Sequence, residues 1–158
     1  MALAVLTGLT YKKAGAGLAT DLQTIVSGVP RVFLELIEGG PHATPETRGA
    51  DRTMPYRTGQ LYGPRRADRL PILLRGWVTG TGATEALQRS DTAAARAEMR
   101  SLFDPTAGPG ELKVTTEQGT VWTITPYPEV IVWEAELQAP THQGLSVRLI
   151  AIDPPSWV

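Results

Sequence analysis

The chain has 158 residues, a formal net charge of −1 at pH 7 and no cysteine. Its length suits one domain with a core of its own, and the lack of cysteine excludes disulfide bridges and thiolate metal sites. No apolar run approaches the roughly 20 residues of a membrane-spanning helix, so we expect no contact with a membrane. The 13 prolines and 16 glycines favour short strands and turns over a helical bundle.

The charges are unevenly spread along the sequence. Residues 41–76 hold seven arginines and three acids, a net charge of +4. Residues 104–158 hold seven acids, one lysine and one arginine, a net charge of −5. Two explanations are open. The charges form ordinary solvated surface, or a basic edge of one subunit meets an acidic edge of the next in a head-to-tail contact that closes into a ring.

The first 20 residues are predicted to be a flexible arm, and residues 21–158 a single domain. Residues 11–20 are rich in glycine and alanine. Neither a Gly-Lys-Ser/Thr sequence nor a strand–helix frame accompanies these glycines, so they do not predict a phosphate-binding loop. An arm of this kind becomes ordered on a neighbouring subunit.

Two strands and a long loop are predicted next. Residues 21–27 alternate weakly, and residues 31–38 alternate with apolar side chains on both faces. Residues 39–68 show little periodicity, and a loop of this length in a compact domain is usually functional or held by a partner. Its arginines do not predict specific nucleic-acid binding, because the pI is about 6.1 and no reading motif accompanies them.

Residues 72–78 are predicted as the central strand. The run is too short for a buried helix. The one convincing helix covers residues 91–103, with Ser90 or Asp91 as its N-cap, and ends at Asp104-Pro105 because proline disfavours a helical residue before it. Its apolar stripe consists of Ala95, Met99, Leu102 and Phe103.

The remainder of the chain is predicted to be β-structure. Alternating patterns mark strands at residues 111–116, 120–125, 130–138 and 145–153. Trp157 is expected to dock in its own domain or on a partner, because an exposed indole is costly. The fold class is therefore mainly β: a β-sandwich or barrel of antiparallel strands, one flanking helix at about 91–103 and a long loop at 39–68.

No catalytic, cofactor or metal site is predicted, and we do not expect an enzyme. His42 and His142 have no second histidine or carboxylate at metal spacing. Glu134 and Glu136 share one face of a strand, where paired acids can serve acid–base chemistry but more often form the solvated side. Three tryptophans either stack sugars or anchor the core, namely Trp77, Trp122 and Trp133.

Several motifs follow one another in a recognisable order. A basic Gly/Pro loop leads into a strand, an Ala/Arg helix follows, and then come a Gly-Pro-Gly break, a Trp/Thr strand and a closing strand at 145–151. The motifs read Arg75-Gly76-Trp77-Val78-Thr79-Gly80, Met99-Arg100-Ser101-Leu102-Phe103, Gly108-Pro109-Gly110-Glu111-Leu112 and Asp153-Pro154-Pro155-Ser156-Trp157. From about Leu22 to the C-terminus, this order resembles the distal tail proteins of long-tailed bacteriophages, in particular their N-terminal ring-forming domain.

The resemblance implies a β-sandwich with one flanking helix that forms a hexameric ring and joins the tail tube to the tip or baseplate. It implies as partners further copies of the chain, the tail tube protein and the tip or baseplate hub proteins, with DNA only passing through the lumen. It places the protein in the virion tail after assembly in the host cytoplasm. Because the chain ends after the first domain, a connector role is favoured over receptor binding.

Two other functions remain open at this point. One is a tail tube or tail terminator protein of the same fold, and the other is a monomeric glycan-binding β-sandwich. For the ring, we expect Arg65, Arg66 and Arg69 to meet acids of the next subunit. The residues predicted to lie at the subunit interface are Arg57, Arg65, Arg66, Arg69, Glu134, Glu136 and Trp157.

Overall fold

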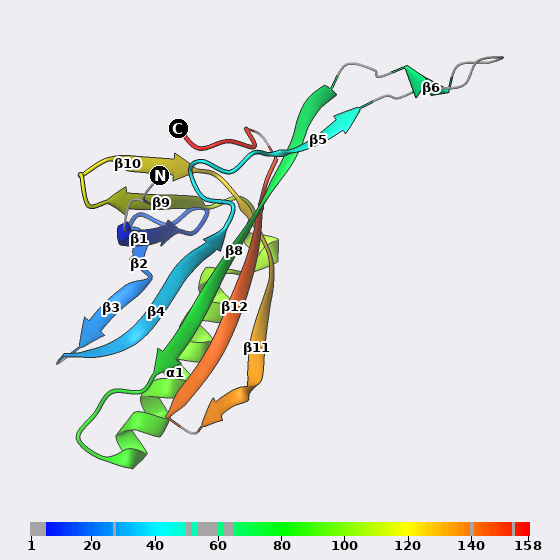
Figure 1. The fold of residues 1–158 in the computed structure, drawn as a ribbon. Helices are drawn as coiled ribbons and strands as arrows, with labels where there is room; N and C mark the ends of the chain where they lie inside the picture. Colours follow the sequence, from blue (N-terminus) through cyan, green and yellow to red (C-terminus); the bar gives the residue numbers. More distant parts are fainter. Residues whose placement is uncertain are drawn as a thin grey trace.

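The computed structural model describes residues 6–26, 28–49, 52–53, 60–61, 65–139, 141–152 and 154–158. This part of the chain is mainly β, with antiparallel sheets and one α-helix, and its sheets do not close into a barrel (Figure 1). The larger sheet has the order β11-β12-β8-β4-β3, with β5 paired to β8, and the smaller has the order β10-β9-β1-β2. The predicted sandwich with one helix is confirmed, and the barrel alternative is not.

The strands of the larger sheet centre on β8 (Arg65–Thr79), as predicted for residues 72–78. The others are β3 (Gln23–Val26), β4 (Val29–Glu38), β5 (Glu46–Gly49), β11 (Tyr127–Ala139) and β12 (His142–Ala151). On β8, Ile72, Leu74 and Val78 are buried. Alternate residues of a strand point to opposite faces, so the even positions of β8 build the core.

The smaller sheet contains a strand where an irregular arm was predicted. Its members are β1 (Leu6–Lys12), β2 (Thr20–Asp21), β9 (Glu111–Thr116) and β10 (Val121–Ile124). Leu9 and Tyr11 of β1 are fully buried, and the Tyr11 ring lies 4.8 Å from that of Phe103. Burial raises the pKa of Tyr11 to about 12. The prediction of a flexible arm is therefore wrong for residues 6–12, because β1 lies between β9 and β2.

The helix α1 (Glu85–Leu102) begins earlier than predicted and covers one face of the larger sheet (Figure 1). Thr84 is its N-cap, and the Thr84 hydroxyl accepts a hydrogen bond from the backbone N–H of Leu87. Ser90 and Asp91 are thus interior residues, and the cap prediction is wrong. The buried stripe of Ala95, Met99 and Leu102 is as predicted. A short 3₁₀ turn, Pro105–Ala107, follows.

The predicted loop at 39–68 is partly strand. β5 pairs with the beginning of β8, from Glu46 opposite Arg69 to Gly49 opposite Arg65. This ladder projects beyond the rest of the sheet (Figure 1), and farther out β6 (Arg52–Thr53) pairs with β7 (Gln60–Leu61). We call residues 46–68 the arm. The alternation of apolar and polar residues is too weak here to predict that β5 pairs with β8. The pairing depends on the length of β8.

The C-terminal residues dock on the body of the protein. Trp157 is only 8% exposed, and its indole N–H donates to the carbonyl oxygen of Gly39 at 2.8 Å. Val158 exchanges two backbone hydrogen bonds with Thr123 of β10. Of the two alternatives expected for Trp157, the structure shows docking in its own domain. Among the residues that the structure describes, no helix is long and apolar enough to cross a membrane.

Candidate assembly surface

The larger sheet has one face on which no element of the described chain packs. In Figure 1, α1 lies behind the sheet and the opposite face is uncovered. Strand register places alternate residues of neighbouring strands side by side on this uncovered face, which we call the open face. Its side chains are exposed or half-buried and mix apolar, aromatic and charged types: Phe33, Glu35, Pro71, Leu73, Arg75, Trp77, Val130, Val132, Glu134, Ser146, Arg148 and Ile150.

An ion pair lies at the centre of the open face. Nε of Arg75 donates to Oε1 of Glu134 at 2.9 Å, and the Ser146 hydroxyl donates to the same oxygen at 3.2 Å. The hydrogen bond from Arg75 lowers the pKa of Glu134, and the carboxylate in turn raises the pKa of Arg75. Glu134, which was predicted to meet an arginine of the next subunit, therefore has an arginine in its own chain. The side chain of Glu136 lies outside the described part of the structure.

Three rings stack across the open face. Phe33 of β4 lies 5.1 Å from Trp77 at 25° between the ring planes, and His142 of β12 lies 6.3 Å from Trp77 at 35°. Since β4 and β12 flank β8 on opposite sides, Trp77 has a ring neighbour on each of the two adjacent strands. Trp122 and Trp133 pack against the core, and the Arg100 guanidinium lies 5.7 Å from the Trp133 ring centre. The three tryptophans considered as sugar platforms are thus packed on protein groups.

Three of the predicted interface arginines lie along the β5–β8 ladder. Nε of Arg69 donates to Oε2 of Glu46 at 2.6 Å, which closes the foot of the arm with an exposed ion pair. Arg65 and Arg66 lie at the outer end of the ladder, opposite Gly49 and Arg48. Arg57 lies outside the described residues. The structure therefore places Arg65, Arg66 and Arg69 along one ladder, whereas Glu134 lies on β11.

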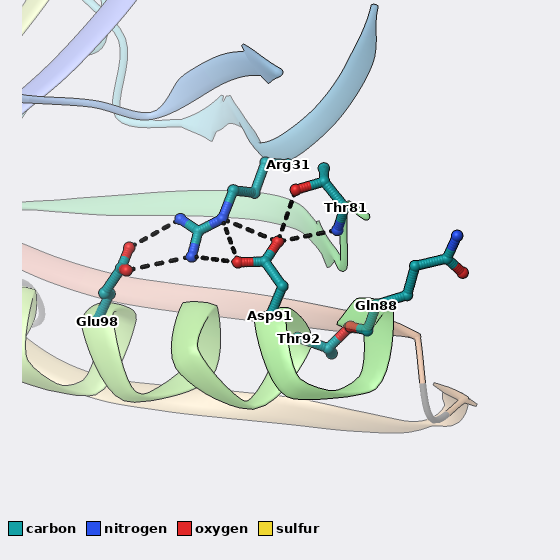
Figure 2. A network of polar contacts seen from close by, with 6 residues as sticks. All are labelled: Arg31, Thr81, Gln88, Asp91, Thr92 and Glu98. Atoms are coloured by element: carbon teal, nitrogen blue, oxygen red, sulfur yellow. Dashed lines mark hydrogen bonds and ion pairs between the residues drawn. The ribbon is translucent and has the colours of Figure 1, made fainter. Parts of the chain in front are cut away.

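A second charged network fixes α1 to the larger sheet (Figure 2). Nε of Arg31, on β4, donates to both carboxylate oxygens of Asp91 at 3.0 and 3.1 Å, and its terminal nitrogens donate to Glu98. The backbone N–H and hydroxyl of Thr81 also donate to Asp91. Burial by itself would raise the pKa of Asp91, but the hydrogen bonds from Thr81 and Arg31 outweigh it and lower this pKa. With its groups paired to one another, the network acts as a structural clamp.

Removing Arg31 tests this clamp. We expect Arg31→Ala to lower the free energy of unfolding at pH 7 by about 2 kcal/mol, because two carboxylates lose charged donors. Because the folded-state pKa of Asp91 is lowered, the stabilisation is present above about pH 4 and is lost as the pH falls further, so the difference from wild type should shrink near pH 3. Urea unfolding followed at several pH values measures this difference.

Arg89→Ala is the matched control for the clamp. Arg89 pairs with Glu85 one turn away on the exposed surface of α1. An exposed i,i+4 pair contributes about 0.5 kcal/mol or less. Equal losses for the two variants, or a loss at Arg31 that does not change with pH, would contradict the role given to Arg31.

The described residues hold no group of three or more histidine, aspartate or glutamate side chains that is arranged to bind a metal ion.

The sequence did not indicate that Arg75 and Arg31 form ion pairs with acidic residues of the same chain. Each of these pairs joins residues about 60 positions apart, and only the strand register and the placement of α1 bring them together. The uneven distribution of charge along the chain was the one sequence feature that indicated ion pairs, and it does not show which arginine pairs with which acid.

Comparison with known proteins shows the fold. No family model and no curated protein matches the chain. The crystal structure of the Dit protein of phage SPP1, described as a paradigm of the hub adsorption apparatus in phages that infect Gram-positive hosts, matches 92% of this chain at 13% identity with a TM-score of 0.57. A chain of the phage P2 baseplate, in its activated conformation with Ca, matches 89% at 8% identity with a TM-score of 0.44.

The matches cover only part of these two solved chains. This chain spans 50% of the SPP1 Dit chain and 43% of the P2 baseplate chain. At 13% identity the likeness to SPP1 Dit establishes a common architecture, whereas function has to be argued from the surfaces described above.

Proposed function

We propose that the protein is a structural component of a long-tailed phage tail, whose copies form a hexameric ring at the distal end of the tail tube and connect it to the tip or baseplate. The observation that carries the proposal is the fold shared over 92% of the chain with SPP1 Dit, a protein described as part of a hub adsorption apparatus. A mechanical role also agrees with the tryptophans, whose rings lie against Phe33, His42 and Arg100 of the same chain.

The arm supports self-association. Among the residues beside the arm whose burial is described, 37–46 and 67–69, none belongs to the buried core. A two-stranded ladder that projects from its sheet is marginally stable on its own. Contact with another copy adds burial to it. The contact is head-to-tail, because an arm and the surface that receives it are different parts of the molecule, and such contacts close into rings.

The interface we propose uses Arg57, Arg65 and Arg66 of the arm against acids of the next copy. Arg69 and Glu134 take part only by exchanging their present partners, Glu46 and Arg75. Trp157 acts from within its own chain by holding Gly39 in place ahead of the arm. The further partners are the tail tube protein and the tip or baseplate hub proteins, and DNA passes only through the lumen.

Charge reversal of the arm tests the ring. We expect the double variant Arg65→Glu, Arg66→Glu to form fewer rings than wild type, with the largest difference from wild type at low salt, where the repulsion between the new acids and the acids of the next copy is least screened. Sedimentation velocity and negative-stain images, with and without purified tail tube protein, measure ring formation.

The control reverses the same number of charges elsewhere. Lys12 and Lys13 lie at the end of β1, on the smaller sheet. Lys12→Glu with Lys13→Glu should leave ring formation unchanged. If the arm variant assembles as wild type does, these arginines have no role in assembly. A wild-type chain that stays monomeric even beside the tube protein would end the ring proposal itself.

A further inference from the structure

A hollow of about 420 Å³ lies between α1 and the loop that joins β1 to β2. Ala16 of this loop and Thr20, the first residue of β2, line it together with Met99 and Leu102 of α1. Its accessible lining is mostly apolar. We call this site the loop hollow. Its size falls in the range of sites that take up a small ligand or a group of side chains.

Leu18 belongs to the same loop and faces solvent. It is 86% exposed, which is the highest value among the large apolar side chains of the described residues. The other residues of the segment 14–19 are all glycine or alanine. A single exposed leucine is common on protein surfaces, but this one stands beside an apolar hollow. The loop therefore presents one large apolar side chain that is suited to act as an anchor in a contact.

The leucine and the hollow lie side by side on one surface. Leu18 does not line the hollow, whereas Ala16 and Thr20, two positions before and after it, do. Its Cα atom is therefore within about 7 Å of the Cα atoms of both. A turn holds the beginning of the loop, because the backbone N–H of Ala16 donates to the carbonyl oxygen of Lys13 at 3.0 Å. An anchor and a receiving site thus occur together on the same face of one chain.

The rim of the loop hollow carries both signs of charge. Lys13 and Glu98 both line it. Such a rim favours neither a basic nor an acidic partner. It matches a second copy related by a two-fold axis, because the lysine of each copy then meets the glutamate of the other. Glu98 already accepts hydrogen bonds from Arg31, but its side chain is 56% exposed and is open to a further donor.

We propose that this surface binds a second copy of the chain across a two-fold axis, with Leu18 of each copy in the loop hollow of the other. A two-fold contact is self-complementary, so the anchor and the hollow have to belong to one surface, as they do here. Leu18 rests on Met99 and Leu102 of the second copy, and Lys13 pairs with Glu98 of the second copy. The surface is small, so we expect a transient dimer.

This contact goes beyond the proposed function and does not depend on it. The proposed ring contact is head-to-tail and uses the arm. The two-fold contact uses α1 and the β1–β2 loop. Because a ring repeats one head-to-tail contact, two copies that are joined across a two-fold axis are not neighbours within one ring. The contact joins free subunits or subunits of separate rings.

Cysteine trapping tests the contact, because the natural chain has no cysteine to interfere. Full-length Ala19→Cys, which keeps Leu18, is mixed under mild oxidation with full-length Ser101→Cys. Ser101 is exposed and lines the loop hollow. We expect the mixed disulfide to form about tenfold faster than in a mixture of Ala19→Cys with Leu87→Cys, because binding raises the effective concentration of the two thiols. Leu87 is 55% exposed near the opposite end of α1.

Removal of the anchor supplies the second measurement. Leu18→Asn, added to both chains of the Ala19→Cys and Ser101→Cys mixture, should slow trapping to the rate of the Leu87→Cys control, because neither copy then buries a leucine in the contact. Leu87→Asn, at an exposed leucine elsewhere, should leave the rate unchanged. Thermal unfolding of each variant shows that the fold is kept.

Charge reversal at the rim supplies the third measurement. Lys13→Glu in both chains should slow trapping severalfold, since two acids then face each other across the contact. Lys113→Glu, at an exposed lysine on β9, is the matched control and should leave the rate unchanged.

The outcomes separate this inference from the proposed function. Equal trapping at residues 101 and 87, or no effect of Leu18→Asn, overturns the two-fold contact. If one chain that carries both Ala19→Cys and Ser101→Cys closes an internal disulfide at high dilution while the mixed disulfide does not form, the loop covers its own hollow and the inference also falls. Rings without selective trapping leave the proposed function standing. Selective trapping without rings, with tube protein present, leaves the two-fold contact standing and removes the ring.

Discussion

Gly76→Ala is expected to lower the free energy of unfolding by about 3 kcal/mol, although it adds one methyl group. Gly76 lies in the middle of β8, in register with Leu34 of β4 and Leu145 of β12. A Cβ atom at this position would overlap the carbonyl oxygen of Phe33 and lie 2.8 Å from its carbonyl carbon and 3.0 Å from Cα of Leu34. These are backbone atoms, so relief requires β4 to move away from the central strand.

Thermal and urea unfolding measure the effect of Gly76→Ala. For a chain of this length, a loss of this size corresponds to a midpoint about 10 °C lower. Gly17→Ala is the control, since a Cβ there meets nothing within 4 Å, and its midpoint should stay within about 2 °C of wild type. A Gly76→Ala chain as stable as wild type would show that β4 and β8 are not held as closely as described.

Replacing residues 49–65 by Asn-Gly is expected to abolish ring formation without unfolding the protein. Arg48 and Arg66 face each other in the ladder, and Asn-Gly suits a two-residue turn between such paired positions. The strand pairs described in the removed segment join it to itself, since β6 pairs with β7 and Gly49 with Arg65. A shorter loop also costs slightly less entropy to close, so the unfolding midpoint should change by only a few degrees. Assembly should be lost because the arm is the proposed contact.

Sedimentation velocity and thermal unfolding decide this prediction together. A chain with Thr58 replaced by Asn keeps the arm and should assemble normally. Rings of wild-type size from the shortened chain would exclude the arm from the interface. An unfolded shortened chain would instead mean that the arm contributes to the core, against the arrangement in Figure 1.

Elements with strong local patterns were predicted well. The alternation of β9, β11 and β12 and the apolar stripe of α1 reflect side-chain periods of 2 and 3.6, which any short stretch of sequence displays. β1 was missed because its glycine and threonines weaken the alternation, and its partner β9 lies about 100 residues away in the sequence. The N-cap was misplaced because Asp91, a favourable cap residue, is used to bind Arg31 instead.

The candidate surface was predicted only in its residue types. Segregated charge indicated arginines on one segment and acids on another, and residues 52–66 do hold arginines without acids. The strand register decides which acidic side chain already has an arginine beside it in its own chain. Glu134 faces Arg75, whereas Glu38 and Glu129 lie where the register of β4 and of β11 shifts. A bulge has no local sequence signature strong enough to be read in advance.

By itself the sequence determined a mainly β chain with one amphipathic helix, a strand at residues 72–78 and an uneven distribution of charge, because these depend on composition and on near neighbours. The tertiary structure decided that residues 6–12 enter a sheet, that an arm leaves it, and which of the described charged side chains pair with one another. These features depend on which strands pair and in what register, and that is settled by contacts between residues far apart in the chain.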